Sequence, residues 1–335
     1  MMIATDTPRC PLPMPMGWFQ VLYSHELAVG DAIPVEYFGQ ELVVFRTEAG
    51  EAKVVDAFCP HMGAHLGYGI REQTGKGPRI VGDSIECPFH GWRWNGEGQC
   101  THIPYAKNMP PRVAKGESIL GAWDVREVNQ QILVWYHPKK EAPTWEPEVI
   151  PEAAANHPDW GEMIIHTWDI NAHMQEMGEN AVDAAHFHYV HGTDDVPEAA
   201  FQNFDGHIRE GKFITRQPTP RGVVDGAIET RSQGAGLSVV RFTGIYDTLL
   251  LANVTPVGPE KTYASYAFIQ PRATQETLGK TVGQAIIGNI CQQMAEDQII
   301  WDRKQYFERP LLCDGDGPFA KFRRWFSQFL VEPTA

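Results

Sequence analysis

The sequence predicts an α+β protein, with an N-terminal all-β domain followed by a domain that combines an antiparallel sheet with a long C-terminal helix. Three features indicate this fold class. Residues 18–58 are rich in strand formers, residues 211–271 contain a second series of strand-like runs, and about 275–308 follow helical spacing. At roughly 100–200 residues per domain, a chain of 335 residues suggests two domains.

In the N-terminal domain, the stretch ELVVFRTEAGEAKVVDAF reads as two apolar strands joined by a polar loop that contains Gly50. The strand-like run QQILVWYH ends near His137, and a segment rich in Pro, Glu and Lys follows it. We therefore expect an N-terminal arm over 1–17, a first domain over 18–137 and a second domain over 138–335.

The second domain begins with a helix expected over about 171–191, which Gly192 would end. The runs GKFITRQP, GVVDGAIETRS, LSVVRFTGIYDTLLLANV and KTYASYAFIQP follow, separated by Gly and Pro, as in an antiparallel sheet. The apolar positions of the long helix are Val282, Ile286, Ile290, Met294, Ile300 and Trp301. The tail from Gly317 predicts one more short helix.

Composition narrows the function classes. The net charge of −14 disfavours nucleic acid as a partner. No run of about 18 apolar residues predicts a membrane span, and the first residues lack the apolar core of a secretory signal. We expect a cytoplasmic protein, in which the six cysteines serve metal ligation better than disulfides.

Two short motifs place Cys59 and His61 in one loop and Cys87 and His90 in a second. Two thiolates and two imidazoles suit a Rieske-type [2Fe–2S] cluster, in which the cysteines hold one iron and the histidines hold the other. A tetrahedral zinc site with the same four ligands is the alternative. His65 and Cys100 lie nearby, and we expect both to be structural.

A second group of candidate ligands lies at His186 and His191. Five residues apart on an ideal helix, they would point 140° away from each other, so the pair requires a bend or a helix end. Two histidines and one carboxylate on one face suit an oxygen-activating Fe(II) site. His188, three residues before His191, is the rival that helical spacing alone favours.

The carboxylate must come from elsewhere in the chain. In the long helix, Asp297 shares a face with Met294 and Trp301, which we expect to be buried. Asp302 abuts Arg303 and reads as a surface ion-pair residue, and Glu296 is the remaining alternative. The sequence favours Asp297.

The segments CPHMGAHLGYG and CPFHGWRWNGEGQC resemble the Rieske domain of ring-hydroxylating oxygenases. The pattern Asn180-x-x-Asp183-x-x-His186-x-x-x-x-His191 resembles the mononuclear iron motif of the same family. The resemblance implies that His186, His191 and Asp297 bind iron, that Asp183 links this iron to a cluster-ligating histidine of an adjacent subunit, and that Asn180 lies close by. It also implies that the second domain has a helix-grip, START-like fold.

One departure from the family is the length of the segment over 62–86, which we interpret as an extended hairpin. The C-terminal segment from Lys304 to Phe329 resembles the oxygenases of the 3-ketosteroid 9α-hydroxylases, and the cholesterol 7-desaturases share parts of it. The resemblance implies a steroid-like substrate, a homotrimer, and electrons supplied from NADH by a ferredoxin-type or flavin reductase.

The sequence leaves three functional alternatives beside 9α-hydroxylation. Rieske irons also support desaturation and O-demethylation, and an electron carrier with an appended binding domain is a non-enzymatic hypothesis. The substrate-binding residues stay open as well. Apolar candidates in the predicted sheet, any of which could be ordinary core, are Phe242, Ile245, Tyr246, Leu249, Leu250, Leu251, Tyr263, Tyr266 and Phe268.

Overall fold

The computed structural model describes residues 8–69, 79–219, 222–272 and 282–332. Internal contacts divide the chain into two compact units. The first comprises Gln20–Tyr136 and Ala142–Glu146, and the second comprises the remaining segments, including the residues that precede Gln20. Among the described helices, none has the length and apolar character needed to cross a lipid bilayer.

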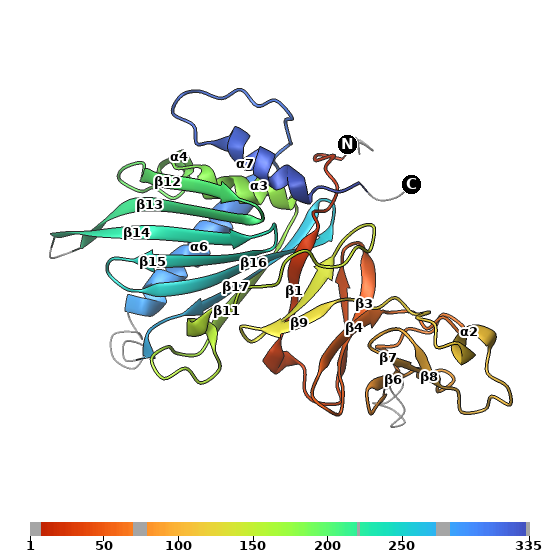
Figure 1. Cartoon of the computed structure of the whole chain (residues 1–335). Helices are drawn as coiled ribbons and strands as arrows, with labels where there is room; N and C mark the ends of the chain where they lie inside the picture. The colour runs from red at the N-terminus through yellow and green to blue at the C-terminus, as the bar shows by residue number, and fades with distance from the viewer. Residues whose placement is uncertain (1–7, 70–78, 220–221, 273–281, 333–335) are drawn as a thin grey trace, which may run out of the picture. The chain divides into compact units, whose positions relative to one another are not determined.

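The N-terminal unit is built from three small antiparallel sheets (Figure 1). The first contains β1 (Gly17–Tyr23), β10 (Gln131–Tyr136) and β9 (Val125–Val128). The second contains β2 (Ala32–Tyr37), β3 (Gln40–Arg46) and β4 (Ala52–Asp56). The third contains β5 (Arg79–Val81), β6 (Ser84–Glu86), β7 (Arg93–Asn95) and β8 (Cys100–His102). A short helix, α2 (Pro111–Ala114), follows the third sheet.

The expected pair of strands around Gly50 is confirmed as β3 and β4, and Gly50 has a positive φ of 89°. Of the extended hairpin expected over 62–86, residues 70–78 lie outside the described chain. The described part is a hairpin, in which β5 pairs with β6 across a turn at Gly82. The core that supports these strands includes Val43, Phe45, Val55, Leu66, Ile85 and Trp94.

The predicted antiparallel sheet of the C-terminal unit is confirmed, and it has seven strands: the predicted runs supply five, and residues 164–170 and 198–205 add the two edge strands. Its strands in spatial order are β11 (Ile164–Ile170), β17 (Lys261–Ile269), β16 (Thr248–Gly258), β15 (Leu237–Thr243), β14 (Gly222–Gln233), β13 (Ile208–Thr219) and β12 (Glu198–Asp205). A short helical turn, η2 (Pro151–Ala153), precedes the sheet in the chain.

The long helix α6 (Gln284–Trp301) crosses one face of this sheet (Figure 1). Met294 and Trp301 are buried as expected, whereas Ile300 is 47% exposed and Ile287, which the prediction omitted, is buried. The prediction that this helix continues to residue 308 is wrong, because α6 ends at Trp301.

Arg9 takes the place of a helical hydrogen bond just beyond the end of α6. In a continued helix, the amide of Tyr306 would donate to the carbonyl of Asp302. Instead, the Arg9 guanidinium donates to the Asp302 carbonyl at 2.5 Å, and the Arg9 carbonyl accepts from the Tyr306 amide at 3.1 Å. One residue of the N-terminal arm therefore satisfies both halves of the missing helical hydrogen bond.

The helix expected over about 171–191 is broken into three parts. These are α3 (Met174–Gly178), the 3₁₀ turn η3 (Glu179–Val182) and α4 (Ala185–Tyr189). Asp183 sits at the second break, where its Oδ1 accepts from the amides of Ala185 and His186 at 2.9 and 3.3 Å. A side chain that caps a new helix start competes with continuation of the old helix.

The short helix predicted near the C-terminus is confirmed as α7 (Phe319–Phe326), and η5 (Ser327–Phe329) follows it. Its apolar side buries Phe322, Trp325 and Phe326. From its polar side, Arg323 donates to the buried carboxylate of Glu179 at 2.7 Å, and Lys304 reaches the same carboxylate at 3.1 Å. These bonds hold α7 beside α3 and η3 (Figure 1).

Candidate metal centres and cavity

The loops that carry Cys59 and Cys87 have the same backbone hydrogen-bond pattern. In each, the amide of the glycine four residues on donates to the cysteine carbonyl, at 2.9 Å for Gly63 and 3.0 Å for Gly91. In each, the cysteine amide donates to the carbonyl five residues on. Both glycines have a positive φ, 73° and 72°, which a side chain would strain. The two motifs therefore form a matched pair of tight loops.

The loops bring their side chains together as two thiols and two imidazoles. The Cys59 and Cys87 thiols hydrogen-bond each other, and this shared proton lowers the pKa of Cys87 while it raises the pKa of Cys59. The rings of His61 and His90 meet edge to face, with centroids 4.9 Å apart. The Nδ1 atoms of both rings are buried and have no hydrogen-bond partner among the described residues.

This donor set fits a two-iron cluster. Buried polar atoms without partners are costly unless a ligand satisfies them, and both orphaned Nδ1 atoms are potential metal donors. Two tryptophans contact this donor set in different ways. Trp92 stacks on His61 with ring centroids 4.3 Å apart, whereas Trp94 donates from its indole Nε1 to the Cys59 sulfur at 3.3 Å.

His65 and Cys100, which we expected to be structural, lie outside this donor set. The Nδ1 of His65 accepts from the Gly67 amide, and its Nε2 lies 3.2 Å from Glu41. Cys100 contacts the carbonyl of His102 through its sulfur.

In the C-terminal unit, His186, His191 and Asp297 converge. One donor atom from each lies within 4.8 Å of the other two, and no other group of three His, Cys, Asp or Glu donors within the described ranges meets that criterion. The helix α4 ends at Tyr189, between the two histidines, and His191 lies beyond the C-cap residue Val190, so the pair is not held 140° apart as it would be on one continuous helix. His188 lies outside the group, and its Nδ1 is bonded to the carbonyl of Thr193.

Hydrogen bonds fix the tautomer and the ring orientation of both imidazoles. The Nδ1 of His186 donates to the carbonyl of Asp183 at 2.9 Å, and the Nδ1 of His191 donates to Glu296 at 3.0 Å. Each ring is thereby left with a free lone pair on Nε2. The Nε2 of His191 lies 3.4 Å from Oδ1 of Asp297.

Charge and burial act in opposite directions on this pair. Burial lowers the pKa of His186, although Asp297 and Asp183 oppose the shift. Burial acts the same way on His191, but the carboxylates of Asp297 and Glu296 outweigh it and raise its pKa. The carboxylates that raise the pKa of His191 would likewise attract a divalent cation, which would take the place of a proton on Nε2.

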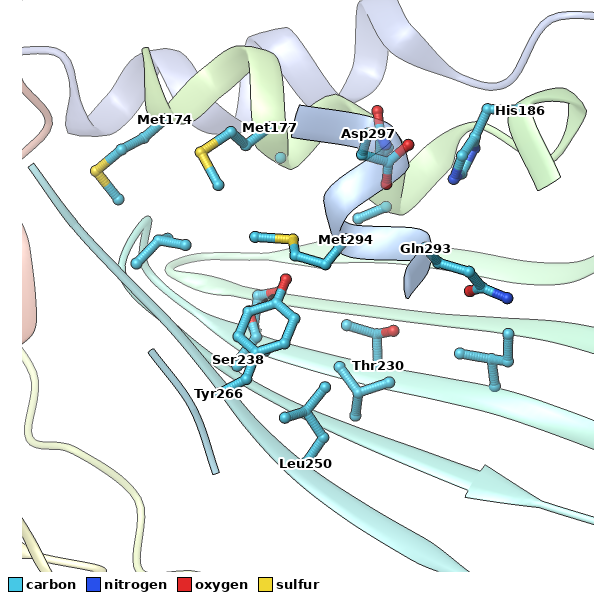
Figure 2. Close-up of a pocket in the computed structure, with 18 of the residues that line it drawn as sticks. Met174, Met177, His186, Thr230, Ser238, Leu250, Tyr266, Gln293, Met294 and Asp297 are labelled. Atoms are coloured by element: carbon cyan, nitrogen blue, oxygen red, sulfur yellow. Dashed lines mark hydrogen bonds between the residues drawn. The ribbon is translucent and has the colours of Figure 1, made fainter. Parts of the chain in front are cut away.

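The three residues lie in the wall of a mostly apolar cavity between α6 and the sheet (Figure 2). Asn180 lines it too, as do Phe322, Trp325 and Phe326 of α7, which the sequence did not single out. Of the nine apolar candidates in the sheet, Phe242, Leu250 and Tyr266 line the cavity. Alternation along the strands turns Leu249 and Leu251 to the opposite face of the sheet.

A row of hydroxyl groups crosses the floor of this cavity. The register pairs Ser232 with Ser238, Ser238 with Ala252, and Ala252 with Tyr266, so the four side chains form one line across four neighbouring strands. All four line the cavity, and the two serine hydroxyls are 2.9 Å apart. The Tyr266 hydroxyl points toward the helix that carries Met294 and Asp297 (Figure 2).

Asp302, expected at the surface as an ion-pair partner of Arg303, has a different contact. Its Oδ1 accepts from the backbone amide of Asn171 at 2.8 Å, so it anchors the end of α6 to the segment after β11.

Two family comparisons cover nearly the whole chain. Residues 17–118 match the Rieske [2Fe-2S] domain, and residues 134–330 match the 3-ketosteroid 9alpha-hydroxylase C-terminal domain. A 3-ketosteroid-9-alpha-monooxygenase oxygenase component from Rhodococcus rhodochrous is 32% identical, over 94% of this chain and 82% of the relative. Cholesterol 7-desaturase nvd from Xenopus laevis is also 32% identical, over 94% and 71%.

The fold is likewise that of known oxygenases. The crystal structure of dicamba monooxygenase bound to dicamba superposes with a TM-score of 0.72 at 16% identity, covering 93% of this chain and 96% of that one. Fold and donor sets together define the oxygenase component of a Rieske-type non-haem iron monooxygenase. Within that class, the chain belongs to the family that carries the 3-ketosteroid 9α-hydroxylase C-terminal domain.

Membership in this family specifies the cofactors and one partner. The protein uses a Rieske [2Fe–2S] cluster and a mononuclear iron, and a separate reductase supplies its electrons. The Rieske domain match also favours the iron–sulfur interpretation of Cys59, His61, Cys87 and His90 over zinc.

Proposed function

We propose that this chain uses O₂ and electrons delivered from NADH by its reductase to hydroxylate a 3-ketosteroid at the 9α position. The observation that carries the proposal is that His186, His191 and Asp297 converge in the wall of a mostly apolar cavity. Iron bound there supplies dioxygen activation, and the apolar walls would hold a polycyclic hydrocarbon skeleton beside it. The named Rhodococcus relative supports the ring position.

The proposal assigns each ligand set to its own domain. Cys59, His61, Cys87 and His90 hold the cluster in a domain that spans 18–137. His186, His191 and Asp297 hold the mononuclear iron in a domain that spans 138–335. The paired loops and orphaned imidazole nitrogens support the first set, and the 4.8 Å grouping supports the second.

The hydroxyl row supports an oxygenated substrate over a plain hydrocarbon. Burial raises the pKa of Tyr266 well above its usual range, so this phenol stays protonated and can donate a hydrogen bond. The hydroxyl of Ser232, Ser238 or Tyr266 could donate a hydrogen bond to a ketone oxygen of the substrate, which would otherwise lie unpaired in a mostly apolar cavity. The aromatic side chains of α7 close off the cavity and help to exclude water.

The proposal extends to assembly and to two further residues. In a ring of three copies, Asp183 would hydrogen-bond a cluster-ligating histidine of the next copy, and Asn180 would lie beside the iron without binding it firmly. The exposed apolar side chains of Met62 and Phe89, next to cluster ligands, support such a contact. A cytoplasmic location is part of the proposal, supported by the six cysteines, none of which forms a disulfide in the described chain.

Desaturation is the second candidate, because the cholesterol 7-desaturase relative is as similar as the hydroxylase. O-demethylation would use the same iron chemistry. The three reactions differ in product, since hydroxylation adds one oxygen atom, desaturation removes two hydrogen atoms, and demethylation releases formaldehyde.

The test is turnover of androstenedione and cholesterol by purified protein with a reductase, NADH and ¹⁸O₂, followed by mass spectrometry. We expect one ¹⁸O atom in hydroxylated androstenedione. A product two mass units lighter would transfer the assignment to desaturation. Failure of a broad steroid panel, with an iron-loaded protein whose cluster the reductase demonstrably reduces, would refute the steroid proposal.

A further inference from the structure

One imidazole of the proposed iron site lies between two consecutive carboxylates. The Nδ1 of His191 is 3.0 Å from Oε2 of Glu296, and its Nε2 is 3.4 Å from Oδ1 of Asp297. The His191 side chain is only 2% exposed. Both ends of the ring are therefore held by one turn of α6.

The two carboxylates have different roles. Asp297 belongs to the group whose donor atoms lie within 4.8 Å of one another, whereas Glu296 does not. Successive helix residues project about 100° apart, so the shorter Asp297 faces the site while the longer Glu296 reaches His191 from the side. The other oxygen of Glu296 accepts from Gln292 at 3.0 Å, which steadies the carboxylate.

The second histidine has a carboxylate only at a longer distance from its Nδ1, that of Asp183 at 3.9 Å, which is beyond a hydrogen bond. That atom of His186 donates to a neutral backbone carbonyl, at Asp183. A carboxylate partner withdraws the Nδ1 proton more strongly than a carbonyl does, and it makes the opposite nitrogen a better metal donor. The hydrogen bonds thus make His191 the stronger of the two imidazole ligands.

We infer that Glu296 is a positioning residue, which fixes the Nδ1–H tautomer of His191 and strengthens the hold of that imidazole on the iron. The inference rests on the proposed ligand set. On sequence grounds Glu296 was an alternative to Asp297 as a ligand. The inference instead places Glu296 behind His191, where it contacts the ligand and not the metal.

The test measures metal affinity in the full-length protein with its cluster intact. The mononuclear iron is removed by mild chelation, and Fe(II) and Co(II) are titrated back anaerobically into wild type, Glu296→Ala, Glu296→Gln and His191→Ala. Asp225→Asn is the charge-matched control, because its 84% exposed carboxylate lies on β14 and outside the cavity lining.

For Glu296→Ala we expect 10- to 100-fold weaker Fe(II) binding and a shifted Co(II) absorption spectrum. Glu296→Gln, whose amide oxygen can still accept from Nδ1, should recover part of the loss and guards against a folding defect. Asp225→Asn should match wild type. Every variant should retain the visible spectrum of the [2Fe–2S] cluster.

Two results would overturn the inference, and they are distinguishable. Wild-type affinity and Co(II) spectrum in Glu296→Ala, with binding lost in His191→Ala, would refute the role of Glu296 alone. Wild-type metal binding in His191→Ala would refute the ligand set, and the inference with it.

Discussion

The indole Nε1 of Trp94 donates a hydrogen bond to the sulfur of Cys59 at 3.3 Å, and both side chains are almost fully buried. The sulfur belongs to the proposed cluster ligand set, so this bond reaches the electronic environment of the iron directly. Hydrogen bonds to ligand sulfurs are one means by which a protein sets the potential of such a centre. Trp94 is thus more than a cover that excludes water.

Replacing Trp94 by Phe should lower the reduction potential of the cluster. A bond to sulfur stabilises the reduced, more negative state, and about 1 kcal/mol of preferential stabilisation corresponds to about 40 mV for one electron. Redox titration followed by visible absorbance measures the change. Trp123→Phe is the control, because the Trp123 indole bonds to the carboxylate of Asp56 instead. An unchanged or raised potential in Trp94→Phe would contradict the prediction.

Iron content should separate His186 from its rival His188. His186→Ala should reduce the iron from about three atoms per chain to about two while the cluster spectrum persists. His188→Ala should keep about three, because His188 lies outside the donor group and bonds to the Thr193 carbonyl. Iron analysis of the two purified variants measures the number of iron atoms per chain and so distinguishes His186 from His188 as the ligand. Loss of cluster absorbance in His186→Ala would argue against separate sites.

Tyr266→Phe should weaken the binding of a ketosteroid but leave the binding of the matching hydrocarbon unchanged. Loss of one neutral hydrogen bond of about 0.5–1.5 kcal/mol corresponds to roughly a 2- to 12-fold change in Kd. Titration calorimetry with androstenedione and 5α-androstane measures both affinities. Tyr263→Phe serves as the control, because Tyr263 lies on the opposite face of β17. Equal loss for both ligands would indicate a packing effect instead of a hydrogen bond.

His173 should make stability fall in mildly acidic solution. Its Nδ1 accepts from the Gln175 amide, its Nε2 contacts the carbonyl of Pro13, and burial lowers its pKa below 6.5. Below about pH 6.5 the unfolded chain therefore takes up a proton that the folded chain resists, so stability is lost as the pH falls from 6.5 toward the folded pKa.

The variant His173→Asn should flatten this dependence, because Asn can still cap α3 but does not titrate. Thermal unfolding between pH 5.5 and 7.5 gives the slopes for both proteins. The comparison uses slopes because the variant also loses the contact with Pro13. A parallel pair of curves would show that another group causes the acid sensitivity.

The two loops that carry the proposed cluster ligands were predictable because their information is local. Each cysteine, histidine and turn glycine falls within five residues, and the structure repeats one loop geometry at both places. Helical phase likewise placed Asp297 beside the buried Met294 and Trp301. The antiparallel sheet followed from runs of strand formers separated by Gly and Pro.

The remaining features of the fold and the site could not be predicted, because they depend on where helices end and on contacts between segments far apart in the sequence. Spacing alone favoured His188 over His186, because it could not reveal that α4 would end at Tyr189, before His191. The hydrogen bonds just beyond the end of α6 involve Arg9, 293 residues away. The aromatic wall from α7 and the contact between Glu296 and His191 also join elements that no local pattern connects.

The role of Arg9 at the end of α6 constrains the order in which the protein matures on the ribosome. Arg9 is synthesised 293 residues before Asp302, and Tyr306 follows shortly afterwards. At about 5–20 residues per second, the arm must wait for roughly 15–60 seconds before its partners exist. The contacts between Arg9 and the residues that follow α6 can therefore form only after residues 302–306 have been synthesised.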